Sequence, residues 1–240
     1  DELFEELSHE EASKRAGLQL NNGGILFEKG GYIEPKALCQ DLLSHKNINL
    51  KLSSTVEKID LDNNNLKLTI NGEVSEYQEV CLCAGYTSKD LLNFSGLSSK
   101  RGQISYVDSS KEFENLKFPI CASGYFSPKT KGSHILGSSY SDVTNDSVLE
   151  EEHISNKKKL KVIHNFNVTI NGGNVGFRAV TKDRLPLVGC NKGIYVNTGH
   201  GSRGSTSSPL CAEIIADLID NRPLPVDHEV AIALDANRFN

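Results

Sequence analysis

Residues 194–219 read IYVNTGHGSRGSTSSPLCAEIIADLI, a short apolar strand that passes through a glycine- and serine-rich loop into a helix. Gly199, Gly201 and Gly204 let the backbone turn sharply and come close to a ligand. The unpaired N–H groups where the helix begins favour negative or electron-rich ligand atoms. The stretch therefore predicts a cradle for such a ligand, with an ordinary strand-to-helix turn as the alternative.

The helix after this loop has a face that we expect to be buried. Ser205, Thr206, Ser207 and Ser208 are suited to cap the helix, and Pro209 suits its first turn. The apolar side chains recur at helical spacing, at Leu210, Cys211, Ile214, Ile215, Leu218 and Ile219. This face should hold the start of the helix firmly under the loop.

The 240 residues have the apolar content of one compact unit, or of two subdomains woven from one chain. The net charge of −5 argues against nucleic-acid binding through an overall positive potential. The basic run Lys157–Lys159 with Lys161 is typical of a solvated helix face, and a phosphate contact is the alternative. No apolar run reaches the roughly 20 residues that span a bilayer and no secretory leader opens the chain, so we expect a cytoplasmic protein without a membrane segment.

The cysteines lie mostly in apolar stretches and never form Cys-x-x-Cys; they are Cys39, Cys81, Cys83, Cys121, Cys190 and Cys211. This pattern predicts reduced thiols in the core rather than disulfides or a zinc site, so no metal is expected.

The first hundred residues mix helices and strands. A helix is predicted over Ser8–Ala16, where Ser8-x-x-Glu11 forms a capping box. A second helix begins at Pro35. Strands are predicted at 23–27, 48–52, 56–61 and 66–70. The run Asn63–Asn65 is typical of a hairpin turn.

A helix face and an apolar run within the first hundred residues are expected to be buried. Leu38, Leu42 and Leu43 form the apolar face of the helix that begins at Pro35. The apolar run Val80–Ala84 is typical of a buried parallel strand that stops at a ligand-binding edge.

From residue 101 to residue 177 the pattern changes to short strands separated by turns. The strands are predicted at 102–107, 120–126, 134–139 and 175–179, with a helix within the charged segment Ser147–Ile163. This predicts an antiparallel sheet inserted between strands of parallel type, and hence a mixed α/β fold.

Four motifs then point to a family. They are Arg101-Gly-Gln-Ile-Ser, Phe177-Arg-Ala-Val-Thr-Lys-Asp-Arg-Leu-Pro-Leu-Val-Gly189, Gly199-His-Gly-Ser-Arg-Gly-Ser-Thr-Ser-Ser-Pro209 and Ala233-Leu-Asp-Ala-Asn-Arg-Phe239. In this order they resemble the FAD-dependent oxidoreductase half of the bifunctional tRNA 5-methylaminomethyl-2-thiouridine biosynthesis proteins. That half is part of the D-amino-acid oxidase and glycine oxidase class of flavoproteins.

The resemblance implies an enzyme that uses FAD to oxidise the C–N bond of a carboxymethylaminomethyl group on the wobble uridine of tRNA. The carboxymethyl piece is removed and aminomethyl-uridine remains. An N-terminal methyltransferase domain of the parent protein would then methylate the amine with S-adenosylmethionine, and none of that domain is present in this sequence.

Such flavoproteins open this half with a strand, Gly-x-Gly-x-x-Gly and a helix that hold the FAD pyrophosphate. Gly23-Gly24 and Gly30-Gly31 lack that spacing and its flanks, so we expect the chain to start downstream of the pyrophosphate site. The predicted fold is therefore a partial Rossmann-like FAD-binding domain, about 35–98 and 183–240, without its N-terminal dinucleotide-binding segment. It is interleaved with an antiparallel-sheet substrate domain, about 1–34 and 99–182.

The resemblance also suggests which residues contact FAD. It brings the Val56 backbone near the adenine end and Ala84 and Gly85 against the dinucleotide, although plain hydrophobic strands account equally well for both segments. The loop from 199 to 206 is expected at the flavin ring, where its amides and the helix dipole would face the N1–C2=O edge that gains charge on reduction. The candidate cofactor-binding residues of this loop are Gly199, Gly201, Ser202, Arg203, Gly204, Ser205 and Thr206.

For the substrate, Arg178 is the first candidate, because a guanidinium can grip a glycine-like carboxylate through two hydrogen bonds. A surface ion pair is the alternative for this arginine. Arg203 is a second candidate catalytic residue that could pair with flavin or substrate. Tyr125 and Tyr32 are candidate cavity walls, or core aromatics.

Other residues near the expected site are given smaller roles. Lys182 and Arg184 could meet tRNA phosphates. Gln103 could serve the sheet or a flavin contact. His200 is nearest the flavin but is not needed as a base, because a neutral amine can lose hydride directly.

Two alternative functions stay open. One is a small-molecule amine oxidase of the glycine or sarcosine type, which would share the loop and the carboxylate-binding arginine. The other is a non-catalytic fragment that lacks the FAD pyrophosphate site.

Overall fold

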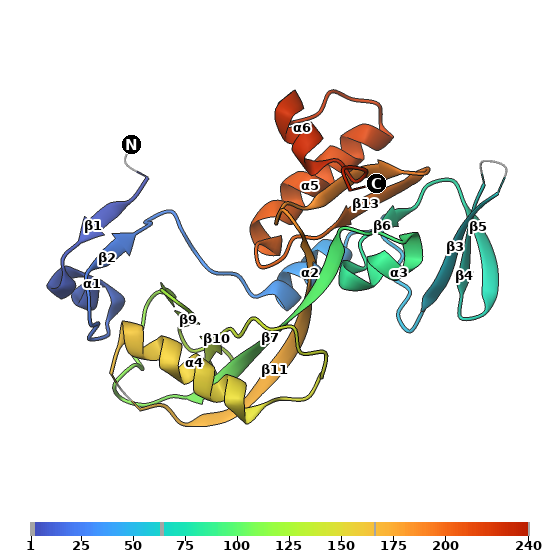
Figure 1. The fold of residues 1–240 in the computed structure, drawn as a ribbon. Helices are drawn as coiled ribbons and strands as arrows, with labels where there is room; N and C mark the ends of the chain where they lie inside the picture. Colours follow the sequence, from blue (N-terminus) through green and yellow to red (C-terminus); the bar gives the residue numbers. More distant parts are fainter. Residues whose placement is uncertain (1–2, 63–64, 166, 240) are drawn as a thin grey trace. The chain divides into compact units, whose positions relative to one another are not determined.

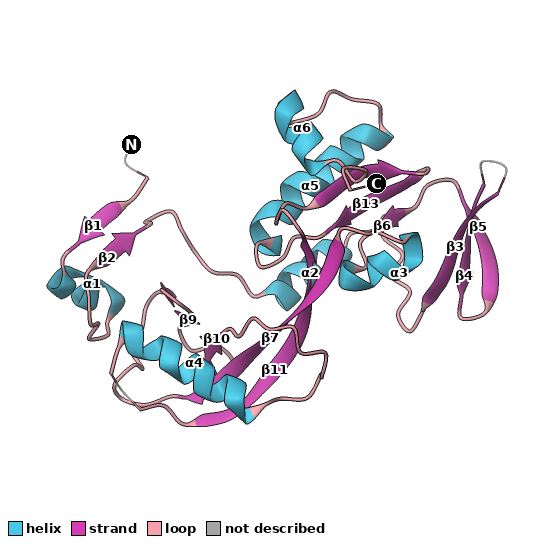
Figure 2. Cartoon of the chain, viewed as in Figure 1, coloured by secondary structure: helices cyan, strands magenta, loops and turns pink. Residues whose placement is uncertain are grey.

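The structure is a computed structural model that describes residues 3–62, 65–165 and 167–239. The chain forms two compact units, each made of two separate segments (Figure 1). The first unit comprises residues 1–34 and 101–176, and the second comprises 35–100 and 177–240. Helices and strands occur in both units, as the mixed α/β prediction requires (Figure 2).

The first unit is built on a five-stranded sheet with the order β11-β7-β10-β9-β8. The strands are β7 (Leu97–Asp108), β8 (Ile120–Cys121), β9 (Tyr125–Phe126), β10 (Ser133–Gly137) and β11 (Ile170–Thr181). β10 runs antiparallel to β7 and β9, and β9 runs antiparallel to β8. The antiparallel sheet is thus confirmed, and the strand predicted at 120–126 is a hairpin of two short strands.

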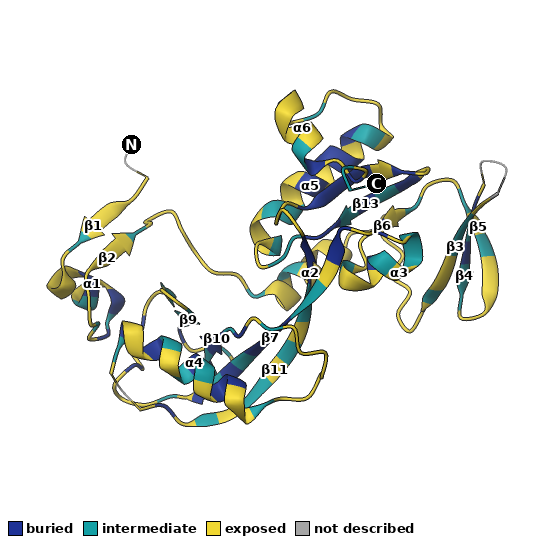
Figure 3. Ribbon diagram, viewed as in Figure 1, coloured by how far each residue is buried: buried dark blue, intermediate teal, exposed yellow. Residues whose placement is uncertain are grey.

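Helix α4 (Glu150–Ile163) supplies the core of this unit together with the sheet (Figure 3). Val107, Phe126 and Leu136 are fully buried, and Leu160 of α4 packs in the same cluster. Of the basic run on α4, Lys158 and Lys161 are exposed, in keeping with a solvated helix face.

The start of the chain adds β1 (Glu5–Leu7), α1 (His9–Ala16) and β2 (Gly24–Leu26), and β1 and β2 pair antiparallel. The Ser8 hydroxyl accepts a hydrogen bond from the Glu11 N–H, and the Ser8 N–H donates to the Glu11 carboxylate at 2.9 Å, so the predicted capping box is confirmed. The box forms from residues three apart, which is why it could be predicted without knowledge of the fold.

A buried polar network links β7 to α4. The Arg101 guanidinium, with no exposed surface, pairs with Glu152 and donates to the carbonyl oxygens of Asn145 and Ser147. Gln103 lies beside it, donating 2.8 Å to the Leu149 carbonyl oxygen. Arg101 and Gln103 of the first quoted motif therefore hold the sheet to the start of α4.

The second unit contains a three-stranded sheet with the order β12-β13-β6. Its strands are β6 (Cys81–Leu82), β12 (Leu187–Asn191) and β13 (Ile194–Thr198). β12 and β13 form an antiparallel hairpin, whereas β13 and β6 are parallel, with Tyr195 opposite Cys81 and Val196 opposite Leu82. This parallel pair brings two segments more than a hundred residues apart to one edge.

Two layers cover this sheet. On one side α5 (Gly204–Ile219) and α6 (His228–Leu234) bury Val188, Cys211, Ile214 and Ile215. The other cluster contains Leu82, Leu187 and Val196 with Phe94 and Leu97. Leu210 and Ile219 of α5 are 42% and 36% exposed, so the buried face of this helix is narrower than predicted.

The remaining elements of the second unit are α2 (Pro35–Leu43), the short 3-10 helix η1 (Gly85–Thr87), α3 (Ser88–Leu92) and a meander of three strands. The meander strands are β3 (Val56–Asp62), β4 (Asn65–Ile70) and β5 (Glu73–Tyr77), paired antiparallel in sequence order. The turn predicted at Asn63–Asn65 lies largely outside the described residues, and Asn65 itself belongs to β4.

Several burial predictions for this unit are wrong. Residues 48–52 form no strand, and Ile48, Leu50 and Leu52 are about half exposed or more, because no strand of the described residues pairs with this segment. α2 buries none of its residues. In the run Val80–Ala84 only Leu82 is buried, since β6 lies at the edge of its sheet.

The cysteines also differ from the prediction. All six are free thiols, but only Cys211 is buried, and Cys39, Cys81, Cys83, Cys121 and Cys190 are exposed. On the edge strand β6, Leu82 is buried and its neighbour Cys81 is exposed, because successive residues of a strand face opposite sides of the sheet.

Candidate functional site

The candidate site lies in the second unit, at the edge where β6 and β13 end. Because these strands are parallel, their carboxyl ends meet at one edge, which is where open α/β sheets bind ligands. Gly85 follows β6, and Gly199 follows β13. The Thr198 hydroxyl donates to the Gly85 carbonyl oxygen at 2.9 Å, so the two segments are in direct contact.

The loop after β13 requires its glycines. Gly199 has φ +77°, and a Cβ there would lie 2.9 Å from Cγ2 of Thr181 and 3.4 Å from the Leu187 backbone nitrogen. Gly201 has φ +57°, with the nearest atom to its would-be Cβ at 4.0 Å. Gly199 is thus needed both for backbone conformation and for close packing, whereas Gly201 is needed for conformation.

This loop runs beside the end of β11. The Gly201 N–H donates to the Ala179 carbonyl oxygen at 2.8 Å, and His200 bridges antiparallel to Val180. Arg178, the first candidate for binding the substrate carboxylate, lies on β11 one residue before Ala179 and is half-buried. The structure therefore brings Arg178 next to the loop, although 20 residues separate it from Thr198 in the sequence.

His200 is part of the support of the loop. Its ring nitrogens lie 2.8 Å from the Ser207 hydroxyl of α5 and 2.8 Å from the Asn197 side-chain oxygen of β13. Burial lowers the pKa of this imidazole. His200 therefore links the loop to both β13 and α5.

Helix α5 begins earlier than predicted. It starts at Gly204, with Arg203 as N-cap and no side-chain cap among the described contacts. Thr206 and Ser207 are inside the first turn, and their hydroxyls donate back to the Arg203 carbonyl oxygen at 2.9 Å. Pro209 lies in the helix interior rather than in its first residues. The predicted capping by the four hydroxyl residues is wrong, because the glycine before them already adopts helical geometry.

Because α5 starts at Gly204, the three loop glycines lie between a strand and the first residue of a helix. Gly199, Gly201 and Gly204 have the spacing Gly-x-Gly-x-x-Gly, and they follow the strand β13 and open the helix α5. Because such flavoproteins carry this pattern at the start of the oxidoreductase half, a match near the end of the chain was not predicted. The flanking strand and helix, both predicted, were the signal that could have found it.

The other predicted site residues of the second unit lie in the loop before α5 and its first turn, at the start of β3, and just before η1. Ser202, Arg203 and Ser205 belong to the loop and first turn and are exposed. Val56 begins β3 in the meander and pairs with Ile70. Ala84 is the residue before η1, next to Gly85.

Tyr125 and Tyr32 belong to the first unit. Tyr125 lies on β9 and is half-buried. Tyr32 is 59% exposed in the segment between β2 and α2. Lys182 and Arg184 follow β11 in the second unit and are exposed.

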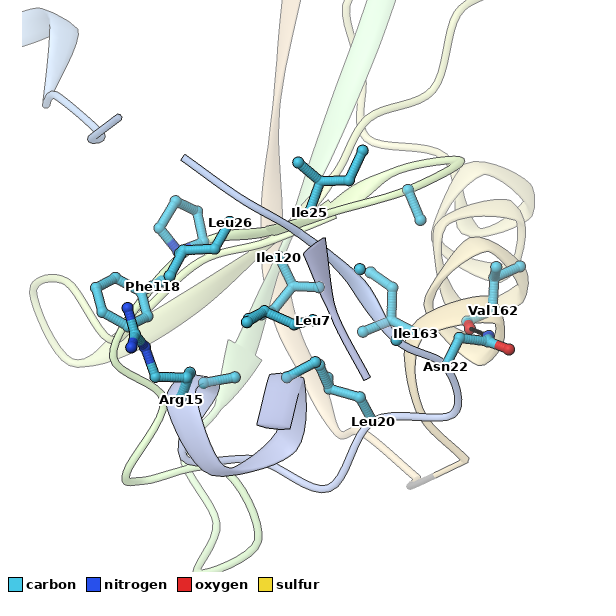
Figure 4. A pocket seen from close by; sticks show the side chains of 16 residues that line it. Leu7, Arg15, Leu20, Asn22, Ile25, Leu26, Phe118, Ile120, Val162 and Ile163 are labelled. Carbon is cyan, nitrogen blue, oxygen red and sulfur yellow. Dashed lines mark hydrogen bonds between the residues drawn. The ribbon is translucent and has the colours of Figure 1, made fainter. Parts of the chain in front are cut away.

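A cavity of about 200 Å³ lies in the first unit, with residues of the paired strands β1 and β2 in its wall (Figure 4). Its walls are mainly apolar and include Leu7, Leu26, Ile120 and Ile163. Arg15 is its one cationic wall residue, and this guanidinium lies 3.0 Å from the Glu28 carboxylate and 3.6 Å from that of Glu5. The cavity contains none of the predicted site residues.

Among the described residues no cluster of three or more histidine, cysteine or acidic side chains could hold a metal ion. The helices of the described part of the chain include none long and apolar enough to cross a membrane.

A profile for FAD dependent oxidoreductases, the DAO family, matches residues 2–218. The chain belongs to this family of FAD-dependent oxidoreductases. The family resemblance and the expected cofactor, FAD, are thereby confirmed.

Curated members with similar sequences are named tRNA 5-methylaminomethyl-2-thiouridine biosynthesis bifunctional protein MnmC. The protein from Pseudomonas syringae pv. tomato is 29% identical over the whole chain, and that from Ectopseudomonas mendocina is 31% identical over the whole chain. The chain spans 43% of the length of each.

Solved structures show that the fold is shared across the family. Glycine oxidase from Geobacillus kaustophilus superposes with a TM-score of 0.83 at 19% identity, over 98% of this chain and 67% of that one. Iminodiacetate oxidase (IdaA) from Chelativorans sp. BNC1 gives 0.82 at 17% identity, over 95% and 66%. The mixed α/β fold predicted from the sequence is that of the DAO flavoproteins.

The residues at the candidate site fit part of an FAD molecule. A Cβ at Gly85, which has φ +61°, would meet no atom within 4 Å, so the backbone there borders open space. Gly204 and Ser205 open α5 and precede its first internal hydrogen bonds, which run from the Thr206 and Ser207 N–H groups to the Arg203 carbonyl oxygen. An open, glycine-lined edge next to a helix N-terminus suits the electron-rich edge of a flavin.

Proposed function

We propose that this chain is part of an enzyme that uses FAD to remove the carboxymethyl group from carboxymethylaminomethyl-uridine at the wobble position of tRNA. The product is aminomethyl-uridine, which an N-terminal methyltransferase domain of the parent protein would methylate with S-adenosylmethionine. The names of the curated relatives support the tRNA substrate, and one feature of the site supports the chemistry.

That feature is the position of Arg178 beside the glycine loop. The substrate group ends in a glycine-like carboxylate, and a half-buried guanidinium is the side chain that binds such a group with two charge-assisted hydrogen bonds. The hydrogen bond from Gly201 to Ala179 and the bridge from His200 to Val180 fix Arg178 relative to the loop. A carboxylate held by Arg178 would bring the neighbouring C–N bond toward the loop.

The chemistry that FAD would supply, when bound, is acceptance of a hydride from the C–H bond of the carbon next to that nitrogen. The loop amides and the start of α5 would stabilise the negative charge that then develops next to them. Gly199, Gly201, Ser202, Arg203, Gly204, Ser205 and Thr206, with Ala84 and Gly85 across the edge, are the residues that we assign to this contact. Val56 is assigned to the adenine end.

In this proposal the second unit binds FAD and, through Arg178, the substrate carboxylate. Tyr125 and Tyr32, both in the first unit, are further candidates for substrate contact. Lys182 and Arg184, both exposed, are candidates for contacts to tRNA phosphates. The site of action would be the cytoplasm, where tRNA is modified.

The test compares two kinds of substrate. Bound flavin is first measured by its visible absorbance, and the protein is then given tRNA that carries the modified uridine, free glycine or free sarcosine. Loss of the carboxymethyl group from the nucleoside, detected by mass spectrometry, is the expected result. Oxidation of glycine or sarcosine alone would instead identify a small-molecule amine oxidase, and absence of bound flavin would identify a non-catalytic fragment.

The role of Arg178 is tested by Arg178→Gln. We expect kcat/KM for the modified tRNA to fall about 100-fold while bound flavin is retained, because about 3 kcal/mol of carboxylate binding is lost. Arg222→Gln is the matched control, since Arg222 pairs with Asp217 and Asp220 at the other end of α5. Equal activity of the two variants would remove Arg178 from the substrate site.

A further inference from the structure

Two thiols stand together on the edge strand β6. Cys81 lies on β6 and Cys83 directly follows it, and their sulfur atoms are 3.6 Å apart, close enough for one thiol to donate to the other. Leu82 between them is buried in the core beneath the sheet, so the two cysteines project from its opposite face. Both are exposed.

The geometry points to a modification site: we propose that Cys81 and Cys83 form a dithiol that hydrogen peroxide oxidises to an intramolecular disulfide. Residues two apart on an extended strand have Cα atoms about 6.4–6.8 Å apart, at the upper end of the distances that disulfides bridge. β6 is a two-residue edge strand that pairs on one side, with β13, among the described residues, so its backbone can adjust. The inference does not depend on the proposed function.

The two thiols have different parts in the reaction. The hydrogen bond from Cys81 lowers the pKa of Cys83 to about 7, and the same contact raises the pKa of Cys81. Cys83 is therefore the thiolate that attacks, and Cys81 keeps its proton. On β13 the neighbour of Cys81 is Tyr195. Burial raises the pKa of Tyr195, and the nearby Glu79 and Cys190 raise it further.

Oxidation of the pair takes two steps. The Cys83 thiolate attacks one oxygen of hydrogen peroxide, the O–O bond breaks, and sulfenic acid and hydroxide form. The Cys81 thiol then attacks the Cys83 sulfur, the S–O bond breaks, and water leaves with the proton from Cys81. In total the two thiols lose two electrons and peroxide is reduced to water.

The oxidation can be measured on one peptide, because trypsin releases Leu68–Lys89 with both cysteines and no others. The reduced protein is treated with one equivalent of hydrogen peroxide at pH 7, alkylated, digested and analysed by mass spectrometry. We expect this peptide to lose two hydrogens and to resist alkylation. Before oxidation, Cys83 should alkylate about tenfold faster at pH 7 than the exposed Cys39 and Cys190, since about half of it is thiolate.

Two variants separate the roles. In Cys81→Ser the Cys83 sulfenic acid should persist and be captured by dimedone, whereas in Cys83→Ser the Cys81 thiol should stay reduced. Far-UV circular dichroism checks that both variants fold. Retention of both hydrogens in the wild-type peptide, disulfides between two chains, or sulfinic acid without a disulfide would each overturn the proposal.

Discussion

Asp183 and Arg238 join two of the quoted motifs through a pair of charge-assisted hydrogen bonds. Arg238 donates to both carboxylate oxygens of Asp183, at 2.8 and 3.0 Å, and also to the carbonyl oxygens of Leu185 and Pro186. Its guanidinium lies 4.6 Å from the ring centre of Phe239. The hydrogen bond from Arg238 holds the pKa of Asp183 well below its usual range. Asp183 and Arg238, called the clasp below, thus hold the C-terminal segment against the residues that follow β11.

Asp183→Asn should lower the free energy of unfolding by about 1–3 kcal/mol at pH 7, because the charge-assisted bonds to Arg238 are lost. Since the pKa of Asp183 is lowered on folding, its stabilisation is present above the unfolded value of about 3.9 and is lost as the pH falls below it. Urea unfolding between pH 7 and pH 3 measures both effects. Asp220→Asn, at an exposed carboxylate, is the control, and an equal effect of the two would contradict the clasp.

Glu152 is the counter-charge of the fully buried Arg101. Desolvation raises the pKa of the Glu152 carboxyl, but hydrogen bonds from Ser139, Ser141 and Arg101 outweigh it and the net shift is downward. Glu152→Gln should destabilise the protein by about 3–5 kcal/mol, because a buried guanidinium is left without its partner. Thermal unfolding of this variant is compared with that of Glu151→Gln, whose side chain is exposed. A loss below about 1 kcal/mol would mean that water reaches Arg101.

At the scale of elements, the turn from β13 into α5 depends on two glycines for different reasons. Gly199→Ala should cost about 2–4 kcal/mol, since it adds backbone strain and a Cβ against Thr181 and Leu187. Gly201→Ala should cost about 1–2 kcal/mol, since its φ is also positive but the space beside it is open. Urea unfolding ranks the two. The reverse order would contradict the packing of Gly199 against the end of β11.

At the scale of the whole molecule, each unit has its own core, so slow hydrogen exchange should map to two separate places. We expect the slowest amides in β7 and β10 of the first unit and in β12 and β13 of the second, where Leu136, Val107, Leu187 and Val196 are fully or nearly fully buried. Residues 47–52, which are exposed and lie outside helices and strands, should exchange at least a hundredfold faster. Hydrogen exchange with mass spectrometry measures this, and protection of 47–52 would contradict the structure.

Elements set by near neighbours could be predicted from the sequence. The capping box of α1, the helix α4 and the hairpin strands β3 and β4 depend on residues a few positions apart, and all were found. The loop of 199–206 was recognised from its glycines and its flanking strand. Helix α5 was expected to have Pro209 in its first turn but starts at Gly204, because hydroxyl residues are compatible both with a cap and with a first helical turn.

The family, the α/β class and the cofactor could be predicted from the motifs, because the order and spacing of these motifs are specific. Three contacts are visible only in the folded chain: Arg178 lies beside the glycine loop, Asp183 binds Arg238, and Cys81 and Cys83 share a face at a sheet edge. Caps and periodicities depend on interactions within a few residues, so the sequence displays them directly. Burial and pairing depend on segments tens to hundreds of residues apart, and these are brought together by the fold.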